Sequence, residues 1–148
     1  MEPWELDARE QIRDLVAAYT WAGDRGRAAD LAACFASDGV LDMGEHGGRR
    51  EGRAAIQQAI EDTVARVAAS GEVPTRVQHH VSSTWIAEMT TTTARVRSYF
   101  AVHTGDGLDH WGRYLDDVVF DGDRWRFASR RVTVDGWAPG SRVVREPS

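Results

Sequence analysis

Hydrophobic positions in the first half of the chain recur at the three- and four-residue spacing of amphipathic helices. Asp7 stands where it can cap a first helix. The apolar stripe of that helix consists of Ile12, Leu15, Val16 and Tyr19. Similar spacing predicts a short second helix over 27–36 and a third over 54–69, with a short strand at 40–43 and a glycine-containing loop at 44–52. The first half is therefore expected to be mainly helical.

After residue 74 the hydrophobic pattern changes to the period of two that is typical of strands. The four expected strands cover residues 77–86, 91–103, 108–120 and 124–134. Short connections such as 121–123 favour antiparallel hairpins. Helices followed by such a meander predict a single α+β domain over 1–148, in which a long, curved antiparallel sheet encloses a pocket. The tail, 138–148, is expected either to be loose or to cover the mouth of that pocket.

Composition removes several classes of chemistry. The 148 residues carry a net charge of −5, and all 18 basic residues are arginine. The absence of lysine excludes Schiff-base chemistry and a P-loop, and the single cysteine, Cys34, excludes an intrachain disulfide. Negative charge argues against a nucleic-acid partner. Since the chain has no long apolar run and begins with an acidic segment, we expect a cytoplasmic protein with no membrane contact.

Histidine carries the strongest candidate chemistry, because imidazole can move protons near neutral pH. His79 and His80 are neighbours in an expected strand, so only one of them can face the interior. His79 shares its face with Val81 and Trp85, which is the more apolar face, and His79 is therefore taken as the inward residue, although the choice between His79 and His80 stays open. Adjacent histidines are a poor metal site, and no metal is expected. The alternative for His79 is a hydrogen-bonded core histidine.

Other polar and aromatic residues have both functional and structural interpretations. Asp24 follows the first helix and suits either a site or a helix cap. On the strand over 108–120, one face carries His110, Tyr114 and Asp116, and the other carries Trp111. Asp116 can serve a pocket or pair with an arginine such as Arg130. Aromatic side chains of this kind supply apolar area for a core or a cavity.

Several segments together resemble the SnoaL-like branch of the NTF2-like superfamily. The matching segments are 12–19, 24, 31–35, 38–39, 52–56, 78–79, 112–116 and 125–127 with Arg130. The resemblance extends over about residues 8 to 137 and implies a cone-shaped α+β fold. It also implies dimers or trimers that pair through the outer face of the sheet.

Within this branch the sequence is similar to cofactor-free lyases such as scytalone dehydratase, bile acid 7α-dehydratase and hexachlorocyclohexane dehydrochlorinase. The resemblance implies a catalytic Asp24–His79 pair that removes a proton beside a leaving group, assisted by Tyr19 and Arg130. The expected substrate-binding residues are Tyr114, His103, His110, Trp111 and Asp116. The implied substrate is a small, mostly apolar cyclic or polyketide-like molecule. An isomerase or cyclase with the same pair, or a non-catalytic binding or dimerisation module, remains the alternative.

Overall fold

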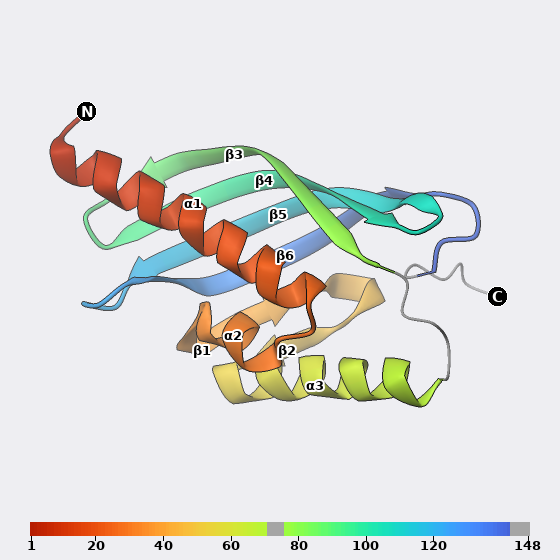
Figure 1. Ribbon diagram of the computed structural model, residues 1–148. Coiled ribbons are helices and arrows are strands. Elements are labelled where there is room, and N and C mark those ends of the chain that lie inside the picture. The colour runs from red at the N-terminus through yellow and green to blue at the C-terminus, as the bar shows by residue number, and fades with distance from the viewer. Residues whose placement is uncertain (71–75, 143–148) are drawn as a thin grey trace.

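Three α-helices, one 3₁₀ helix and a six-stranded sheet make up the described part of the chain. A computed structural model describes residues 1–70 and 76–142 (Figure 1). The elements are α1 (Pro3–Asp24), α2 (Ala28–Ala33), β1 (Phe35–Asp42), the 3₁₀ helix η1 (Gly44–His46), β2 (Arg49–Glu51), α3 (Arg53–Ala69), β3 (Gln78–Met89), β4 (Thr93–Thr104), β5 (Gly107–Phe120) and β6 (Trp125–Trp137). No helix within the described ranges has the length and apolar content needed to span a membrane.

The strands form one curved, open sheet in the order β2-β1-β6-β5-β4-β3. The meander from β3 to β6 is antiparallel, as the sequence predicted. The expectation of a purely antiparallel sheet is wrong at one place, because β1 pairs with β6 in parallel. The connection between them contains β2, α3 and the strands β3, β4 and β5, and is thus long enough for the crossover that parallel strands require. In Figure 1, α1 lies across one face of the sheet and reaches β3 at its C-terminal end.

The first helix begins earlier than the sequence predicted. Pro3 occupies its first turn, where a fixed φ is favourable and a missing N–H costs nothing. The Glu5 carboxylate accepts a hydrogen bond from the Glu2 backbone N–H at 3.0 Å. Asp7 does not act as the cap; it accepts a hydrogen bond from Gln11 one turn later, at 2.7 Å. The helix does begin with a capping contact of the predicted kind, but this contact lies between Glu2 and Glu5, more than one turn before the predicted cap at Asp7.

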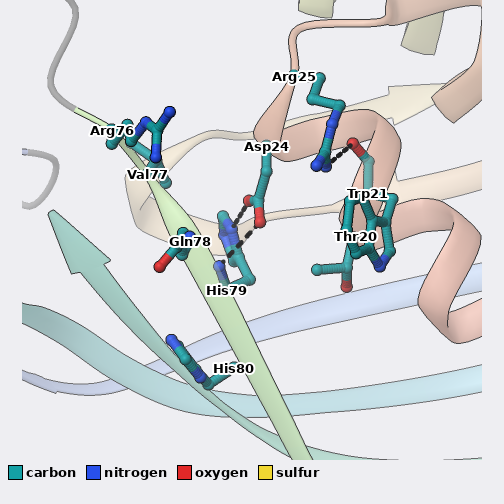
Figure 2. A pocket seen from close by; sticks show the side chains of 9 residues that line it. All are labelled: Thr20, Trp21, Asp24, Arg25, Arg76, Val77, Gln78, His79 and His80. Atoms are coloured by element: carbon teal, nitrogen blue, oxygen red, sulfur yellow. Dashed lines mark hydrogen bonds and ion pairs between the residues drawn. The ribbon is translucent and has the colours of Figure 1, made fainter.

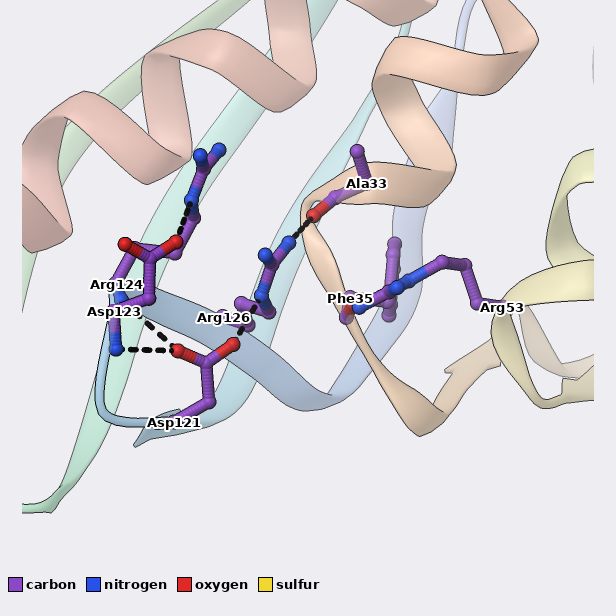
Figure 3. Close-up of polar contacts among 7 residues, drawn as sticks. All are labelled: Ala33, Phe35, Arg53, Asp121, Asp123, Arg124 and Arg126. Carbon is purple, nitrogen blue, oxygen red and sulfur yellow. Dashed lines mark hydrogen bonds and ion pairs between the residues drawn. The ribbon is translucent and has the colours of Figure 1, made fainter.

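The second helix is shorter than expected, because Phe35 already begins β1. Arginine side chains hold this corner together (Figure 3). Arg53 donates to the Phe35 carbonyl from Nε at 3.0 Å and from Nη2 at 2.7 Å. Arg126 on β6 donates to the Ala33 carbonyl and to the Asp121 carboxylate. Because backbone and side-chain donors converge on Asp121, the pKa of its carboxyl lies well below the usual range.

The core lies between the helices and the inner face of the sheet. Ile12, Leu31 and Ile56, one from each helix, are buried against Phe35 and Phe127. Burying side chains of this size contributes about 1.5–3 kcal/mol each before the cost of ordering them. This packing fixes the C-terminal end of α1 against the sheet and so positions the residues described next.

A bulge in β3 changes which side chains face the core. Ser82 pairs with Tyr99 and Trp85 with Arg97, so β3 has one extra residue there, and Ser83 has a left-handed φ of 52°. The alternation is therefore inverted from Ser83 to the second register shift, which lies between Ile86 and Glu88. Trp85 lies on the outer face and not on the face of His79, which corrects the expectation for that residue.

The described part of the tail is anchored to β5. Asp109 accepts hydrogen bonds from the Ser141 hydroxyl at 2.7 Å and from the Arg142 backbone N–H at 2.8 Å. Its carbonyl accepts a further one from the Ala138 N–H at 2.8 Å. The rest of the predicted tail, 143–148, lies outside the described residues.

Candidate active site

An aspartate from the helical half meets a histidine from the strand half (Figure 2). Asp24 is the last residue of α1, and His79 lies near the start of β3. The Asp24 Oδ1 to His79 Nδ1 distance is 2.5 Å, and the other carboxylate oxygen accepts a hydrogen bond from the His79 backbone N–H at 3.1 Å. The two carboxylate oxygens thus fix both the ring and the backbone of His79. The Asp24 side chain is 13% exposed and the His79 side chain is 29% exposed, so solvent reaches this pair only in part.

A hollow of about 420 Å³ adjoins this pair, and we call it the dyad pocket. Its lining comes from the C-terminal end of α1 and the start of β3. The lining residues are Thr20, Trp21, Asp24, Arg25, Arg76, Val77, Gln78, His79 and His80. The volume lies within the range of small-molecule sites. Trp21 and Val77 are the apolar side chains of this lining, and the other lining residues carry charged or polar groups.

A second hollow of about 390 Å³ continues along the seam between α1 and β3. Thr20, Trp21 and His79 line both hollows. Thr84 reaches the second one because of the bulge at Ser83, and its hydroxyl lies 3.2 Å from that of Ser98 on the inner face of β4. His79 is therefore accessible from two directions.

Arg130 and Asp116 form a buried ion pair deeper in the fold. Arg130 donates from Nε and Nη2 to the two Asp116 oxygens, both at 2.8 Å, and both side chains are 0% exposed. The guanidinium lies over the rings of Tyr114 at 3.8 Å, Tyr19 at 4.3 Å and Phe127 at 4.4 Å. Burial opposes its charge, but Asp116 raises the pKa of Arg130. Arg130 Nη1 has no hydrogen-bond partner among the described residues. The predicted Arg130, Asp116, Tyr114 and Tyr19 thus come together, but beside the dyad pocket and not in its lining.

Both tyrosines of this cluster stay protonated at neutral pH. Burial raises the pKa of Tyr114, and burial likewise raises that of Tyr19, with Arg130 partly offsetting the rise. Their hydroxyls are therefore hydrogen-bond donors. The Tyr19 ring packs edge-on against Tyr114, with centroids 6.3 Å apart. The apolar stripe of the sequence thus predicted a core position for Tyr19 correctly.

A second carboxylate–imidazole pair lies on the inner side of β5. The His110 Nδ1 to Asp109 Oδ2 distance is 2.8 Å, and both residues are buried. Burial lowers the pKa of His110, and Asp109 offsets this only in part. Strand register puts His79 opposite Val102 and Val102 opposite His110, so the two imidazoles belong to one row across the sheet.

Sequence reasoning missed Asp109 and, apart from Asp24, did not single out the pocket residues of α1. Asp109 is inserted at a bulge, where Leu108 pairs with His103 and His110 with Val102, and no sequence signal marks this bulge. Trp21 had a signal: it precedes Asp24 by three residues, a spacing that puts both on one helix face.

Two predicted substrate-binding residues are not part of the lining of the dyad pocket. His103 is adjacent to His80 on the outer face, with ring centroids 4.7 Å apart. Trp111 is also on the outer face, where its ring covers Gly136. Strand alternation explains both positions, because their inward neighbours are Val102 and His110. Within 1–70 and 76–142, no cluster of three or more metal-ligating side chains occurs.

The fold and the site together define a class: a half-open α+β cone with an aspartate–histidine pair at the seam of helix and sheet. A family model described as the SnoaL-like domain matches residues 4–131. The chain therefore belongs to the SnoaL-like family, and solved structures with an NTF2-like or cystatin-like fold resemble it. Among curated proteins, no significant match exists.

Solved structures from two bacteria illustrate the likeness. A provisionally assigned scytalone dehydratase from Novosphingobium aromaticivorans has a TM-score of 0.79 at 23% identity, covering 98% of this chain and 94% of that one. A protein of unknown function from Mycobacterium tuberculosis has a TM-score of 0.72 at 25% identity, covering 90% and 80%. A provisionally assigned aromatic ring hydroxylase from N. aromaticivorans has a TM-score of 0.71 at 20% identity, covering 88% and 91%.

Proposed function

We propose that the protein is a cofactor-free lyase of the dehydratase type, in which the Asp24–His79 pair removes a proton from carbon. The observation that carries this proposal is the 2.5 Å contact between Asp24 Oδ1 and His79 Nδ1 at the wall of the dyad pocket. A carboxylate in this position favours the tautomer with hydrogen on Nδ1 and leaves Nε2 as the base. The same carboxylate stabilises the imidazolium once it has formed.

The proposed reaction balances without a further reagent. His79 Nε2 takes the proton from the carbon next to a carbonyl, and the electron pair of the broken C–H bond moves into an enolate. As the enolate collapses, the C–O bond to the neighbouring hydroxyl breaks, and the imidazolium returns the proton to that oxygen. Water leaves and the pair is restored. A positioned acid–base group typically contributes about 10²- to 10⁴-fold to the rate.

Substrate contacts are proposed for residues of the inner face. Tyr19 and Tyr114 lie behind the lining of the dyad pocket and are protonated donors, suited to the enolate oxygen of a substrate that extends inward past His79. His110 is held by Asp109 on the row of His79, where it can accept a hydrogen bond from a substrate hydroxyl. For Arg130 and Asp116 we propose a supporting role, since their pairing and burial hold the two tyrosine rings in place.

An isomerase or cyclase is the second candidate function, because proton abstraction by the same pair is its first step. In that reaction the imidazolium returns the proton to another carbon, or the enolate attacks a second carbonyl. The open seam beside His79, with hollows on two sides, is compatible with either course.

We also propose that the protein associates with itself through the outer face of the sheet. Trp85 is 60% exposed and Tyr99 is 59% exposed there, and Trp111 and Leu115 are exposed on the neighbouring strand. Exposed apolar groups gathered on one face are typical of protein interfaces. Sedimentation equilibrium should show a dimer or trimer that Tyr99→Arg dissociates; a monomeric wild-type protein would refute this proposal.

Product analysis tests the proposed function. The protein would be incubated with a panel of cyclic β-hydroxyketones, and the products followed by mass spectrometry and proton NMR. Loss of water, abolished by His79→Ala, supports the lyase. A product of unchanged mass supports the isomerase or cyclase. No turnover by the folded wild-type protein with any member of the panel, or turnover that His79→Ala retains, counts against the dyad as the catalytic device.

A further inference from the structure

Two arginines border the dyad pocket without a carboxylate partner among the described residues. Arg25 follows α1 and Arg76 precedes β3, and both line the pocket. Figure 2 shows their side chains on opposite sides of the Asp24–His79 pair. Neither forms an ion pair with any residue of 1–70 or 76–142, although seven other arginines do. Among the described residues of the lining, Asp24 is the only carboxylate, and it is already bonded to His79.

The charge of this pocket is thus opposite to that of the whole chain. The protein carries a net charge of −5, yet the two guanidinium groups face a hollow in which their charge is not balanced. A local positive field of this kind attracts anions to the pocket and raises their rate of encounter. The sign of the charge that borders this pocket therefore differs from the sign of the net charge of the protein.

Arg25 is also held in place before any ligand arrives. Its guanidinium lies 3.8 Å from the centroid of the Trp21 ring, and Nη1 donates to the Trp21 carbonyl at 3.3 Å. These two contacts leave its other N–H groups for a ligand. A planar guanidinium suits the two oxygens of a carboxylate, and a fixed one loses less entropy on binding. The exposed Trp21 ring offers a flat apolar surface beside it.

We propose that the dyad pocket binds a cyclic carboxylate, whose ring contacts Trp21 and whose negative charge is balanced by Arg25 on one side of the pair and Arg76 on the other. This inference rests on the proposed function in taking the ligand to be the substrate. A carboxylate beside the reacting carbon normally hinders proton removal, because negative charge accumulates on the enolate. The two guanidinium groups compensate that charge and so make such a substrate compatible with the Asp24–His79 pair. The volume of about 420 Å³ is sufficient for a bicyclic acid.

Binding of two matched probes tests this proposal. 2-Naphthoate and 2-naphthamide have nearly the same shape and differ by one charge. Titrations followed by Trp fluorescence and by calorimetry would compare wild-type protein with the Arg25→Gln/Arg76→Gln double variant. Arg66→Gln is the matched control, because Arg66 is an exposed arginine of α3 outside the pocket. His79→Ala separates binding from turnover.

We expect the wild-type protein and the Arg66→Gln variant to bind 2-naphthoate about tenfold more tightly than 2-naphthamide, which matches two partly exposed ion pairs. The double variant should bind both probes within twofold, and 0.5 M salt should reduce the wild-type preference. His79→Ala should keep the preference, so a failure of the proposed catalysis is separable from a failure of this inference. Equal wild-type affinities, no binding of 2-naphthoate at millimolar concentration, or a preference that survives in the double variant would overturn the inference.

Discussion

The replacement Asp116→Asn is expected to destabilise the fold severely. It leaves the Arg130 guanidinium charged and wholly buried, without a counter-charge and with one acceptor oxygen in place of the two that each lie at 2.8 Å. Removing one partner of a buried ion pair lowers the free energy of unfolding by about 3–5 kcal/mol, because the remaining charge is neither paired nor solvated. Domains of this size have a total stability of about 5–15 kcal/mol, so the loss is a large fraction of it. The expected fall in melting temperature is about 6–20 °C.

Urea unfolding followed by circular dichroism measures this loss. The chain contains a matched control, since Arg113 and Asp135 form the same kind of pair between β5 and β6 on the outer face. Asp135→Asn should leave the unfolding midpoint almost unchanged, because solvent replaces the lost contacts. The double replacement Asp116→Leu/Arg130→Met should recover most of the stability that Asp116→Asn loses. Equal and small effects of Asp116→Asn and Asp135→Asn would refute the reasoning.

Three further predictions concern single residues. Burial raises the pKa of Cys34 to about 11, so alkylation by iodoacetamide at pH 8 should be about 100-fold slower than for a thiol at the ordinary value of 9.0, and urea should remove the difference; equal rates would contradict it. Burial lowers the pKa of His110, so protonation of this imidazole opposes folding. The stability that the neutral imidazole contributes is present above about pH 6.5 and decreases as the pH falls below that value. Urea unfolding should therefore show that the free energy of unfolding decreases more steeply with acid in the wild-type protein than in His110→Gln. A Cβ on Gly112 would lie 1.9 Å from the Thr133 carbonyl oxygen, so Gly112→Ala should lower the stability by about 2 kcal/mol or more, as measured by a thermal melt. Gly107→Ala is the control: no atom lies within 4 Å of its added Cβ, so this variant tests the effect of backbone conformation alone.

Local periodicity predicted most of the elements but not where the sheet is irregular. The four long strands were identified from alternation alone, and their observed ends lie within three residues of the predicted ones. Alternation does not reveal the bulge at Ser83, because a bulge depends on how two strands pair and not on one strand's sequence. The parallel pairing of β1 with β6 was also missed, since it depends on tertiary packing around α3.

The candidate site was predictable where the sequence resembled a family and not elsewhere. Asp24 and His79 are 55 residues apart in sequence, and only the resemblance related them. The geometry then placed His103 and Trp111 on the outer face, which residue type alone does not indicate. Arg25 and Arg76 could not be predicted as pocket residues, because both flank regular elements and their positions depend on how α1 meets β3.

Deuterium incorporation from heavy water tests the central claim most directly. A carbon acid that the protein processes would be incubated in D₂O, and loss of its α-proton signal followed by NMR. Asp14→Asn is a control on the same helix, since Asp14 is exposed and apart from the dyad pocket. The account predicts rapid exchange with wild type and Asp14→Asn, and at least about 100-fold slower exchange with Asp24→Asn and with His79→Ala. Exchange by the folded Asp24→Asn and His79→Ala variants within twofold of wild type would contradict it.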